Sequence, residues 1–562
     1  MGPIAPKDPV RQREFFYIML EKEISSAPSP QGGGVCSIYE NDERLVTAAK
    51  IVGNVTDESM LQMLRSVADF RKLVYGVGVS IMCSGVDKCN FAFQMYGKTD
   101  PYHSGTTLRR EITTDGSEYL IPFDEAEWKD DDDIPGQIRF EFAKHGFLAT
   151  VNVRLFLNDG YTAPPFEEPE PIDLNAPGFR DMIAKSLVSA GSNGRLKKVI
   201  ERAEAGEDLT IAFIGGSITQ GAGATPIHTE CYARKAFESF ERKYMKGGKA
   251  TFIKAGVGGT SSELGIVRYD RDVLVNGKHS PDLVVIEFAV NDAGDETGGD
   301  CFEGLLRTVL NSPNHPAVIL IFSVFTGGYN LEDRLIPIGE HYGVAMTSVK
   351  RAVMPQFSLT KAEGRVVPKY RFFYDSYHPT NIGHMIMAEC IGYLIDAAAA
   401  DRSEDKDTDF TYFPPLRSDD FENVHFIDRA ENTFGAMISH GDFDDNDPVL
   451  QQCEMNMDPM TTPRFPFNWM HESGSRPFEM EVTCRRLLIV TKDESDIRVG
   501  RADIYVDGKF IKTVDPHEIG WCHCNSQIII REKESAKHHI EVRMHEGDGD
   551  KQFTILGFGI VV

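Results

Sequence analysis

The sequence predicts a flavodoxin-like three-layer α/β/α domain flanked by two β-sandwich domains. Three observations lead to this prediction. Short strand-like runs fill both ends of the chain, apolar strands alternate with helices in its middle, and polar segments separate these regions. The chain has 562 residues, of which 41% are hydrophobic and 35 are Phe. Because a domain usually contains about 100–200 residues, this length accommodates two to four packed domains.

Residues 1–165 are predicted to form an N-terminal accessory β-sandwich of jelly-roll type. The expected strands are short, rich in β-branched or aromatic residues, and separated by turn pairs such as Ser-Gly and Asp-Gly. They are expected at Lys72–Met82, Phe91–Tyr96, Thr107–Thr113, Gln137–Phe142 and Leu148–Leu157. The following segment, Ala163–Gly178, is rich in proline and acidic residues, which is typical of a linker.

Residues 179–400 are predicted to form the α/β/α domain. Continuous apolar runs, which we expect to be strands, occur at Leu209–Ile214, Thr251–Lys254, Leu283–Ala289, Ala317–Val324 and Val344–Ser348. Helical patterns lie between them, for example at Cys231–Tyr244 and Leu331–His341. Continuous apolar strands that alternate with helices indicate a parallel sheet covered on both faces. Five such strands fit a flavodoxin-like sandwich better than an eightfold barrel.

Residues 415–562 are predicted to form a second β-sandwich, after a charged linker at Arg402–Asp409. The expected strands lie at Phe478–Cys484, Arg486–Thr491, Ala502–Val506, Gln527–Ile530 and His539–Arg543. The tetrapeptide Val506-Asp-Gly-Lys509 is a hairpin signal, because an Asp-Gly pair suits the tight turn between two antiparallel strands.

The charge of the chain argues against nucleic-acid and membrane partners. There are 59 Lys and Arg residues and 85 Asp and Glu residues, which gives a formal net charge of −26. Such a surface repels phosphate backbones and anionic lipids, and no apolar run approaches the roughly 20 residues that span a bilayer. The first twenty residues carry charges where a signal peptide would have its apolar stretch. We therefore expect a cytoplasmic protein.

The cysteines do not suggest a disulfide framework or a metal site. The ten cysteines are scattered along the chain. Cys522-His523-Cys524 resembles a metal-binding sequence, but a structural zinc site needs Cys-x-x-Cys spacing and a second pair of ligands. We expect this tripeptide to lie inside a strand, and we expect no metal in the protein.

Polar clusters follow the predicted strands of the middle domain. The first strand ends in Gly215-Gly216-Ser217, where a serine begins a helix after a tight turn. This tripeptide alone is typical of an ordinary glycine-rich turn. Similar clusters, however, follow other strands: Val257-Gly258-Gly259-Thr260, Asn291-Asp292 and Asp375-Ser-Tyr-His378. Because the carboxyl ends of parallel strands share one edge of the sheet, we expect these clusters to converge.

In these four clusters the chain resembles the SGNH (GDSL-type) hydrolases. The resemblance covers about residues 207–400, and the blocks occur in the family's order: Gly-Gly-Ser217, Gly259, Asn291 and Asp375-x-x-His378. The first block departs from the usual Gly-Asp-Ser, because position 216 is Gly. The second block has Lys254-Ala-Gly where Asn-x-Gly is common, so that Gly258 is the alternative to Gly259.

The resemblance implies a serine-esterase mechanism that needs no metal ion or organic cofactor. Ser217 is the implied nucleophile, His378 the general base, and Asp375 the group that orients the imidazole. The backbone N–H groups of Ser217 and Gly259 and the side-chain amide of Asn291 are the implied oxyanion hole. Other histidines are weaker candidates for the base. His384 lies inside the last helix and is expected to pack or face solvent. His228 follows the nucleophile helix and is expected, if it has a role, to line the pocket.

The first block and Glu287–Asp292 also resemble carbohydrate esterases of this family. We therefore expect an esterase that removes O-acetyl groups from plant-type oligosaccharides, such as xylan or mannan fragments. His228 and Trp521 are the candidate substrate-binding residues. The alternative for Trp521, and for Trp469, is a place in the core of the C-terminal sandwich. Two other functions stay open: a lipid- or thioester-directed hydrolase of the same fold, and a non-catalytic glycan-binding protein. A homodimer is also left open, since two accessory sandwiches offer surfaces for it.

Overall fold

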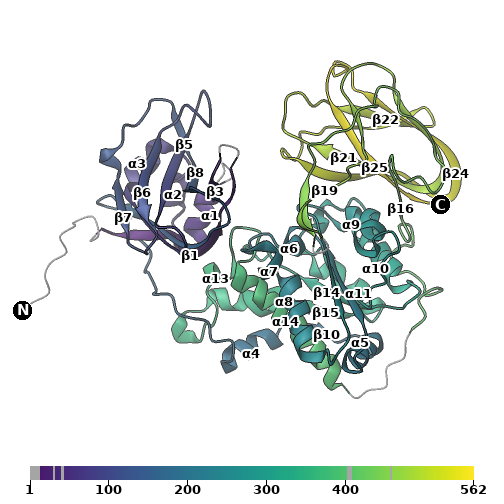
Figure 1. The fold of residues 1–562 in the computed structure, drawn as a ribbon, viewed down its shortest axis with the longest axis horizontal. Coiled ribbons are helices and arrows are strands. Elements are labelled where there is room, and N and C mark those ends of the chain that lie inside the picture. The colour runs from purple at the N-terminus through teal and green to yellow at the C-terminus, as the bar shows by residue number, and fades with distance from the viewer. Residues whose placement is uncertain (1–12, 30–31, 39–42, 402–407, 456–457) are drawn as a thin grey trace, which may run out of the picture. The chain divides into compact units, whose positions relative to one another are not determined.

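The computed structural model describes residues 13–29, 32–38, 43–401, 408–455 and 458–562 (Figure 1). These residues form two compact units. The first contains residues up to Leu174 together with Gln356–Gly383, and the second contains Asn175–Pro355 and His384–Val562. The predicted boundaries at 165, 179, 400 and 415 stay a prediction from sequence. Most of the expected linker Arg402–Asp409 lies outside the described residues.

The first unit contains two antiparallel sheets. One has the strand order β1 (Phe15–Ser25), β9 (Leu148–Leu157), β4 (Val74–Cys83) and β7 (Tyr119–Pro122). The other has the order β2 (Ala27–Pro28), β3 (Gly34–Ser37), β8 (Asp132–Phe142), β5 (Lys88–Gly97) and β6 (Thr107–Thr113). Buried residues of both sheets, among them Val77, Val153, Phe91 and Phe140, share one core. This is the predicted N-terminal sandwich.

Three short helices of this unit were not predicted: α1 (Arg44–Ile51), α2 (Glu58–Met63) and α3 (Val67–Leu73). Capping side chains begin two of them. The Asp57 carboxylate accepts from the N–H of Ser59 at 2.8 Å, and the Ser66 hydroxyl accepts from the N–H of Asp69 at 3.2 Å. Because α3 ends at Leu73, strand β4 begins two residues later than the expected start at Lys72.

The second unit contains the predicted parallel sheet. Its strands are β12 (Ala250–Gly256), β11 (Leu209–Gly215), β13 (Leu283–Glu287), β14 (Ala317–Phe322) and β15 (Ala345–Ser348), in that spatial order. Relative to their order in the chain this is 2-1-3-4-5, the order of flavodoxin-like sheets. A short strand that the sequence analysis did not name, β10 (Leu187–Ser189), pairs antiparallel with β15 at the edge.

Helices cover both faces of this sheet. Ala212 and Ile214 of β11 belong to a core that they share with α9 (Ser262–Tyr269), α10 (Asp300–Leu310) and α11 (Glu332–His341). Phe213, between them, points to the opposite face, where its ring lies 6.0 Å from that of Tyr232 on α8 (Tyr232–Tyr244). The α/β/α domain also contains the helices α5 (Gly194–Glu204) and α14 (Asn381–Ala400). The three-layer arrangement is therefore as predicted.

Eight of the C-terminal strands form one continuous sheet, and β18 (Gln452–Met455) and β19 (Asp458–Pro463) form a separate two-stranded sheet. The main order is β16 (His425–Ile427), β25 (Phe553–Val561), β21 (Phe478–Asp493), β24 (His523–Met544), β22 (Ala502–Val506) and β23 (Lys509–Val514). Two short strands, β17 (Met437–Ser439) and β20 (Trp469–His471), pair with β21 and β25. Residues that include Leu488, Val490 and Leu556 pack into the same core as α9 and α10. The C-terminal sheet and the parallel sheet therefore belong to one compact unit.

No apolar run long enough to span a membrane was expected, but among the described residues α14 has the length and hydropathy of such a helix. Its most apolar window has a mean hydropathy of 1.3, but 56% of that window is buried inside the protein. Such burial is typical of an apolar helix in the core of a protein.

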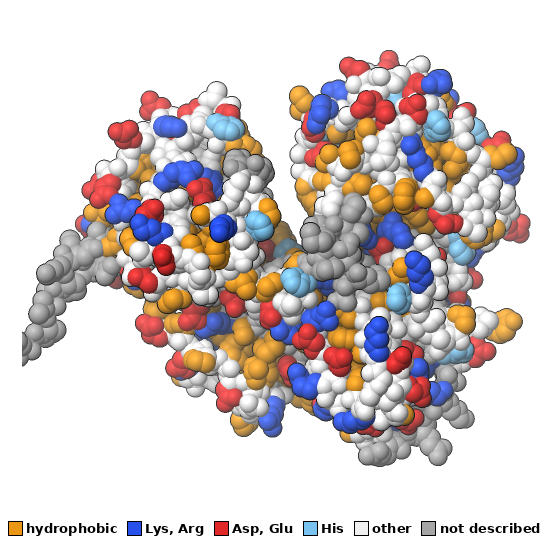
Figure 2. Space-filling model, viewed as in Figure 1, with side chains coloured by type: hydrophobic (Ala, Val, Ile, Leu, Met, Phe, Trp, Pro, Cys, Tyr) orange, Lys and Arg blue, Asp and Glu red, His pale blue; other side chains and the backbone are white. Residues whose placement is uncertain are grey.

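On the face shown in Figure 2, acidic and basic side chains are interspersed.

Candidate active site

Ser217 lies at a tight turn between β11 and the short helix α6 (Ser217–Gln220). Its side chain is partly exposed, whereas the strand before it is buried. The two glycines before it leave room for other groups. A Cβ atom on Gly215 would collide with the hydroxyl of Thr219, and one on Gly216 would lie 2.8 Å from Cγ of Asn291. Gly215 therefore leaves room for Thr219, and Gly216 lets the asparagine approach the turn that carries the serine.

Three of the predicted blocks meet at this turn. A Cβ atom on Gly256, at the end of β12, would collide with the backbone N of Gln220 in α6. A Cβ atom on Gly258 would lie 3.8 Å from Cβ of Ser217. Since Asn291 reaches Gly216 from the end of β13, the second unit brings the serine, the glycine loop and the asparagine together. Their convergence agrees with the placement of strand ends in a parallel sheet.

Buried polar side chains support these loops from below. Arg268 on α9 is fully buried and donates to the carbonyl oxygens of Ala255 at 2.7 Å and Gly215 at 2.8 Å. It thus joins the ends of β12 and β11. The Asp292 carboxylate accepts from the N–H and hydroxyl of Ser262, which fixes the start of α9. Burial raises the pKa of Asp292 well above its usual value, and the nearby Asp295 raises it further. Through its bonds to Ser262, Asp292 therefore holds the loop after β13 against the start of α9.

The C-terminal region supplies Gln451 and His523, which the sequence did not suggest for the site, and Trp521, which it did. Gln451 donates from Nε2 to the carbonyl oxygen of Gly258 at 2.9 Å. His523 places Nε2 3.1 Å from the carbonyl oxygen of Gly259. Trp521 packs beside the same glycine, because a Cβ atom there would lie 2.8 Å from Cζ2 of the indole. Both carbonyl groups that flank the Gly259 N–H and Cα are therefore held from the C-terminal region.

Asp375 and His378 lie in the first unit, on the loop after α13 (Lys369–Phe372). One carboxylate oxygen of Asp375 accepts from the N–H groups of Tyr377 and His378, both at 2.8 Å. The other lies 2.9 Å from Nδ1 of His378. Burial raises the pKa of Asp375, but the imidazole and the two N–H groups outweigh it and lower the pKa to about 2. The aspartate is thus ionised and fixes the imidazole.

Residues of the N-terminal sandwich contact this loop within the first unit. Lys22 of β1 donates to the carbonyl oxygen of Tyr374 at 3.2 Å, and its ammonium group lies 3.6 Å from the centre of that ring. The hydroxyls of Thr47 and Ser376 are 3.1 Å apart. Burial lowers the pKa of Lys22 to about 8, although the charge of Asp375 opposes this shift.

The same four-residue motif occurs a second time in this unit. Asp100 and His103 have the same spacing, and Oδ2 of the aspartate lies 3.0 Å from Nδ1 of the histidine. Oδ1 of Asp100 also accepts from the N–H groups of Tyr102 and His103. Side-chain exposure differs, however: 81% for His103 against 22% for His378. The hydrogen-bond pattern is therefore a property of the local sequence, whereas low side-chain exposure and the family's order of blocks distinguish Asp375 and His378.

The remaining candidates divide clearly. His384 is fully buried, accepts from the N–H of Tyr232 at Nδ1 and faces the carbonyl oxygen of Ala222 with Nε2. Both ring nitrogens therefore contact backbone groups inside the protein, which agrees with the expectation that His384 packs. His228 is exposed on α7 (Ile227–Glu230). Trp469 is a core residue with 3% exposure, whereas Trp521 is 44% exposed. The core alternative therefore holds for Trp469 and fails for Trp521.

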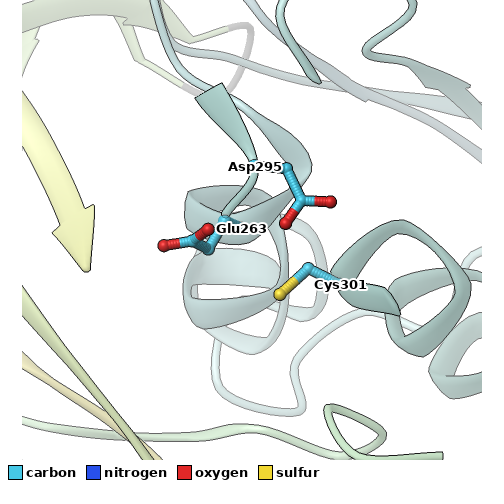
Figure 3. Close-up of side chains that lie close together, drawn as sticks. All are labelled: Glu263, Asp295 and Cys301. Atoms are coloured by element: carbon cyan, nitrogen blue, oxygen red, sulfur yellow. The ribbon is translucent and has the colours of Figure 1, made fainter. Parts of the chain in front are cut away.

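Glu263, Asp295 and Cys301 form a buried cluster in which one ligand atom from each residue lies within 4.8 Å of the others (Figure 3). The carboxylate of Asp295 is already used, because it accepts from the N–H groups of Thr297 at 2.9 Å and Gly299 at 2.7 Å. These bonds fix the turn before α10. The hydrogen bonds of Asp295 therefore give it a structural role in this cluster. Burial raises the pKa of the Glu263 carboxyl group well above its usual value.

Comparisons with known proteins agree with the resemblance seen in the sequence. Residues 213–386 match the model of the GDSL-like Lipase/Acylhydrolase family. The crystal structure of a two-domain esterase (CEX) active on acetylated mannans matches with 27% identity and a TM-score of 0.56, over 68% of this chain and 99% of that chain. The same esterase co-crystallised with mannopentaose matches with 26% identity and a TM-score of 0.56, over 68% of this chain and 98% of that chain. No curated protein matches. The predicted family resemblance and the α/β/α domain with flanking β domains are thus confirmed.

Proposed function

We propose that this chain, a carboxylic ester hydrolase with an SGNH (GDSL-type) domain, is a serine esterase that removes O-acetyl groups from mannan- or xylan-type oligosaccharides. The observation that carries the proposal is the similarity to an esterase active on acetylated mannans, at 27% identity over 99% of that chain. The grouping of Ser217, Gly258 and Asn291 at one sheet edge supports it.

The proposed mechanism passes through an acetyl-serine. Oγ of Ser217 attacks the acetyl carbonyl carbon while Nε2 of His378 takes its proton. The oxyanion accepts from the N–H groups of Ser217 and Gly259 and from the Asn291 amide. The intermediate then breaks the bond to the sugar oxygen, which takes the proton from His378 and leaves as a hydroxyl group. Water attacks the acetyl-serine by the same route and releases acetate. The 2.9 Å contact between Asp375 and Nδ1 supports this assignment, since it keeps the proton on Nδ1 and makes Nε2 the nitrogen that accepts a proton.

Trp521 is the proposed sugar-binding residue, and His228 is a second candidate. The indole is 44% exposed and lies beside Gly259, so a bound oligosaccharide could stack on it while its acetyl group enters the site. We expect Trp521→Ala to lower kcat/KM for acetylated oligosaccharides about tenfold, which corresponds to about 1.4 kcal/mol. Phe510→Ala, at a similarly exposed aromatic residue on β23, should have no effect. If Trp521→Ala and Phe510→Ala had the same kcat/KM for acetylated oligosaccharides, Trp521 would not be part of the substrate site.

The experiment that tests the proposed function measures acetate release from acetylated manno- and xylo-oligosaccharides. Wild type should release acetate, and Ser217→Ala should reduce the rate roughly 10⁴-fold or more, because the nucleophile is lost. A ratio of the two wild-type rates then decides between mannan and xylan. p-Nitrophenyl esters of increasing chain length are assayed in parallel.

Each other outcome selects a different function. Cleavage of p-nitrophenyl acetate through Ser217, without acetate release from either oligosaccharide, would keep the esterase and reject the sugar. A preference for acyl chains of eight or more carbons would favour the lipid- or thioester-directed hydrolase. Glycan binding that Ser217→Ala does not change, with no turnover, would favour the binding protein.

A further inference from the structure

We propose that Gln451, assisted by His523, positions the oxyanion hole, so that the C-terminal β region is part of the catalytic apparatus. The inference rests on the proposed function, in which the N–H of Gly259 stabilises the oxyanion. It adds a role for residues that lie about 190 and 260 positions away in sequence from that glycine.

The first step of the argument concerns one peptide group. The carbonyl of Gly258 and the N–H of Gly259 belong to the same planar unit, and in a trans peptide they point in opposite directions. The 2.9 Å hydrogen bond from Gln451 Nε2 to the Gly258 oxygen therefore also sets the direction of the Gly259 N–H. A hydrogen bond to the carbonyl further polarises the N–H and strengthens it as a donor.

The second step concerns the amide of Gln451, whose orientation is determined by its own partner. Its Oε1 accepts from the backbone N–H of Cys524 on β24 at 2.9 Å. Since a backbone N–H can only donate, the oxygen must face Cys524 and the NH₂ group must face Gly258. The side chain is 7% exposed, so water has little access to compete for these bonds.

The third step concerns the carbonyl on the other side of Gly259. Nε2 of His523 lies 3.1 Å from this oxygen, and Nδ1 lies 2.9 Å from Oδ2 of the fully buried Asp493. Gly259 has a φ of +73°, a left-handed conformation that glycine adopts without strain. The peptide groups on both sides of Gly259 are thus held in an unusual turn by neighbouring residues of one strand, β24, and by Gln451.

A positioning role predicts a specific kinetic change. Gln451→Met keeps the length of the side chain and removes the donor. Gln451→Glu keeps the shape and the acceptor for Cys524 but presents no NH₂ group to Gly258. Both variants should lower kcat for p-nitrophenyl acetate about 10–100-fold with KM nearly unchanged, since a mispositioned donor loses part of the roughly 10²–10³-fold that one oxyanion donor provides. The small substrate removes any contribution from sugar binding.

The measurements separate positioning from stability. Thermal melting checks that each variant is folded, and Gln452→Met, at the exposed neighbouring glutamine, serves as the matched control. Methylboronic acid, which forms a tetrahedral adduct with a nucleophilic serine, serves as the transition-state analogue. Its inhibition constant should rise by the same factor by which kcat/KM falls. A merely structural role would shift the melting temperature without this parallel change.

The outcomes also distinguish this inference from the proposed function. Folded Gln451 variants with wild-type kcat, or with a raised KM and unchanged kcat, would overturn the inference while the esterase stands. Wild type without turnover, or turnover that Ser217→Ala does not reduce, would overturn the proposed function and the inference with it. Reduced kcat and weakened boronate binding in the folded variants, with Gln452→Met unaffected, would support the inference.

Discussion

Replacing Asp375 with Asn is expected to lower kcat/KM about 10⁴-fold while the protein remains folded. The aspartate now accepts from Nδ1 of His378 at 2.9 Å, and its second oxygen accepts from two backbone N–H groups. The amide oxygen of Asn can keep the backbone bonds, so its NH₂ group would face the imidazole. Nδ1 would then have to accept, and Nε2 would carry the proton, which is the wrong tautomer for a general base.

The control for this prediction is Asp100→Asn, which makes the same change in the second copy of the motif. Because Asp100 and His103 are exposed and lie outside the family blocks, activity should be unchanged.

The pKa of Asp375, about 2, also predicts how the stability contributed by this aspartate depends on pH. The folded-state pKa is lower than the unfolded value of about 3.9. The resulting stabilisation is therefore present above pH 4 and is lost as the pH falls through 2. Full activity of Asp375→Asn at neutral pH would contradict the assignment of the pair.

Gly216→Ala is expected to reduce kcat about 10²–10³-fold, the effect of losing one oxyanion donor. The new Cβ atom would collide with Oδ1 of Asn291 and lie 2.8 Å from its Cγ, so the asparagine must move. Steady-state kinetics with p-nitrophenyl acetate measures the loss. Gly392→Ala, on α14 and with open space around it, is the matched control and should have wild-type activity.

A double-mutant cycle tests whether Gly216→Ala acts through the asparagine. Asn291→Ala alone should cost a similar factor. If the two changes remove the same interaction, adding Gly216→Ala to Asn291→Ala should have little further effect. Two losses that multiply would contradict the proposed coupling and would place the damage at the serine itself.

The sequence was sufficient where the signal is local and repetitive. The apolar runs at Leu209–Ile214 and Leu283–Ala289 coincide closely with β11 and β13, because a doubly covered parallel strand must be apolar throughout. The C-terminal sheet was harder. Single strands, β21 and β24, replace two pairs of expected strands, and a register shift between Cys484 and Arg486 interrupts the pattern of the first while pairing continues. The polar segment 532–537 interrupts the apolar pattern of the second.

The candidate site shows the same limit. Ser217, Asn291 and His378 stand in recognisable blocks, so their places could be predicted one by one. Gln451 has no motif around it, and its role depends on a contact with Gly258 that only the folded chain creates. His523 lies in strand β24, as expected of the Cys-His-Cys tripeptide, but its contact with the Gly259 carbonyl could not be predicted from the sequence. Long-range contacts of single polar side chains leave no periodic trace in sequence.

The contacts between the N-terminal sandwich and the loop that carries Asp375 and His378 limit how far the sandwich can be exchanged as a separate module. Glu21 pairs with Arg371, Lys22 with the Tyr374 carbonyl, and Thr47 with Ser376. A chain begun after the sandwich would keep every strand of the parallel sheet yet leave this loop without those partners. The sandwich is therefore not an interchangeable attachment. If recombination replaced the sandwich with an unrelated domain, the new domain would have to form equivalent contacts to the loop. The sandwich and the loop are therefore expected to be inherited together.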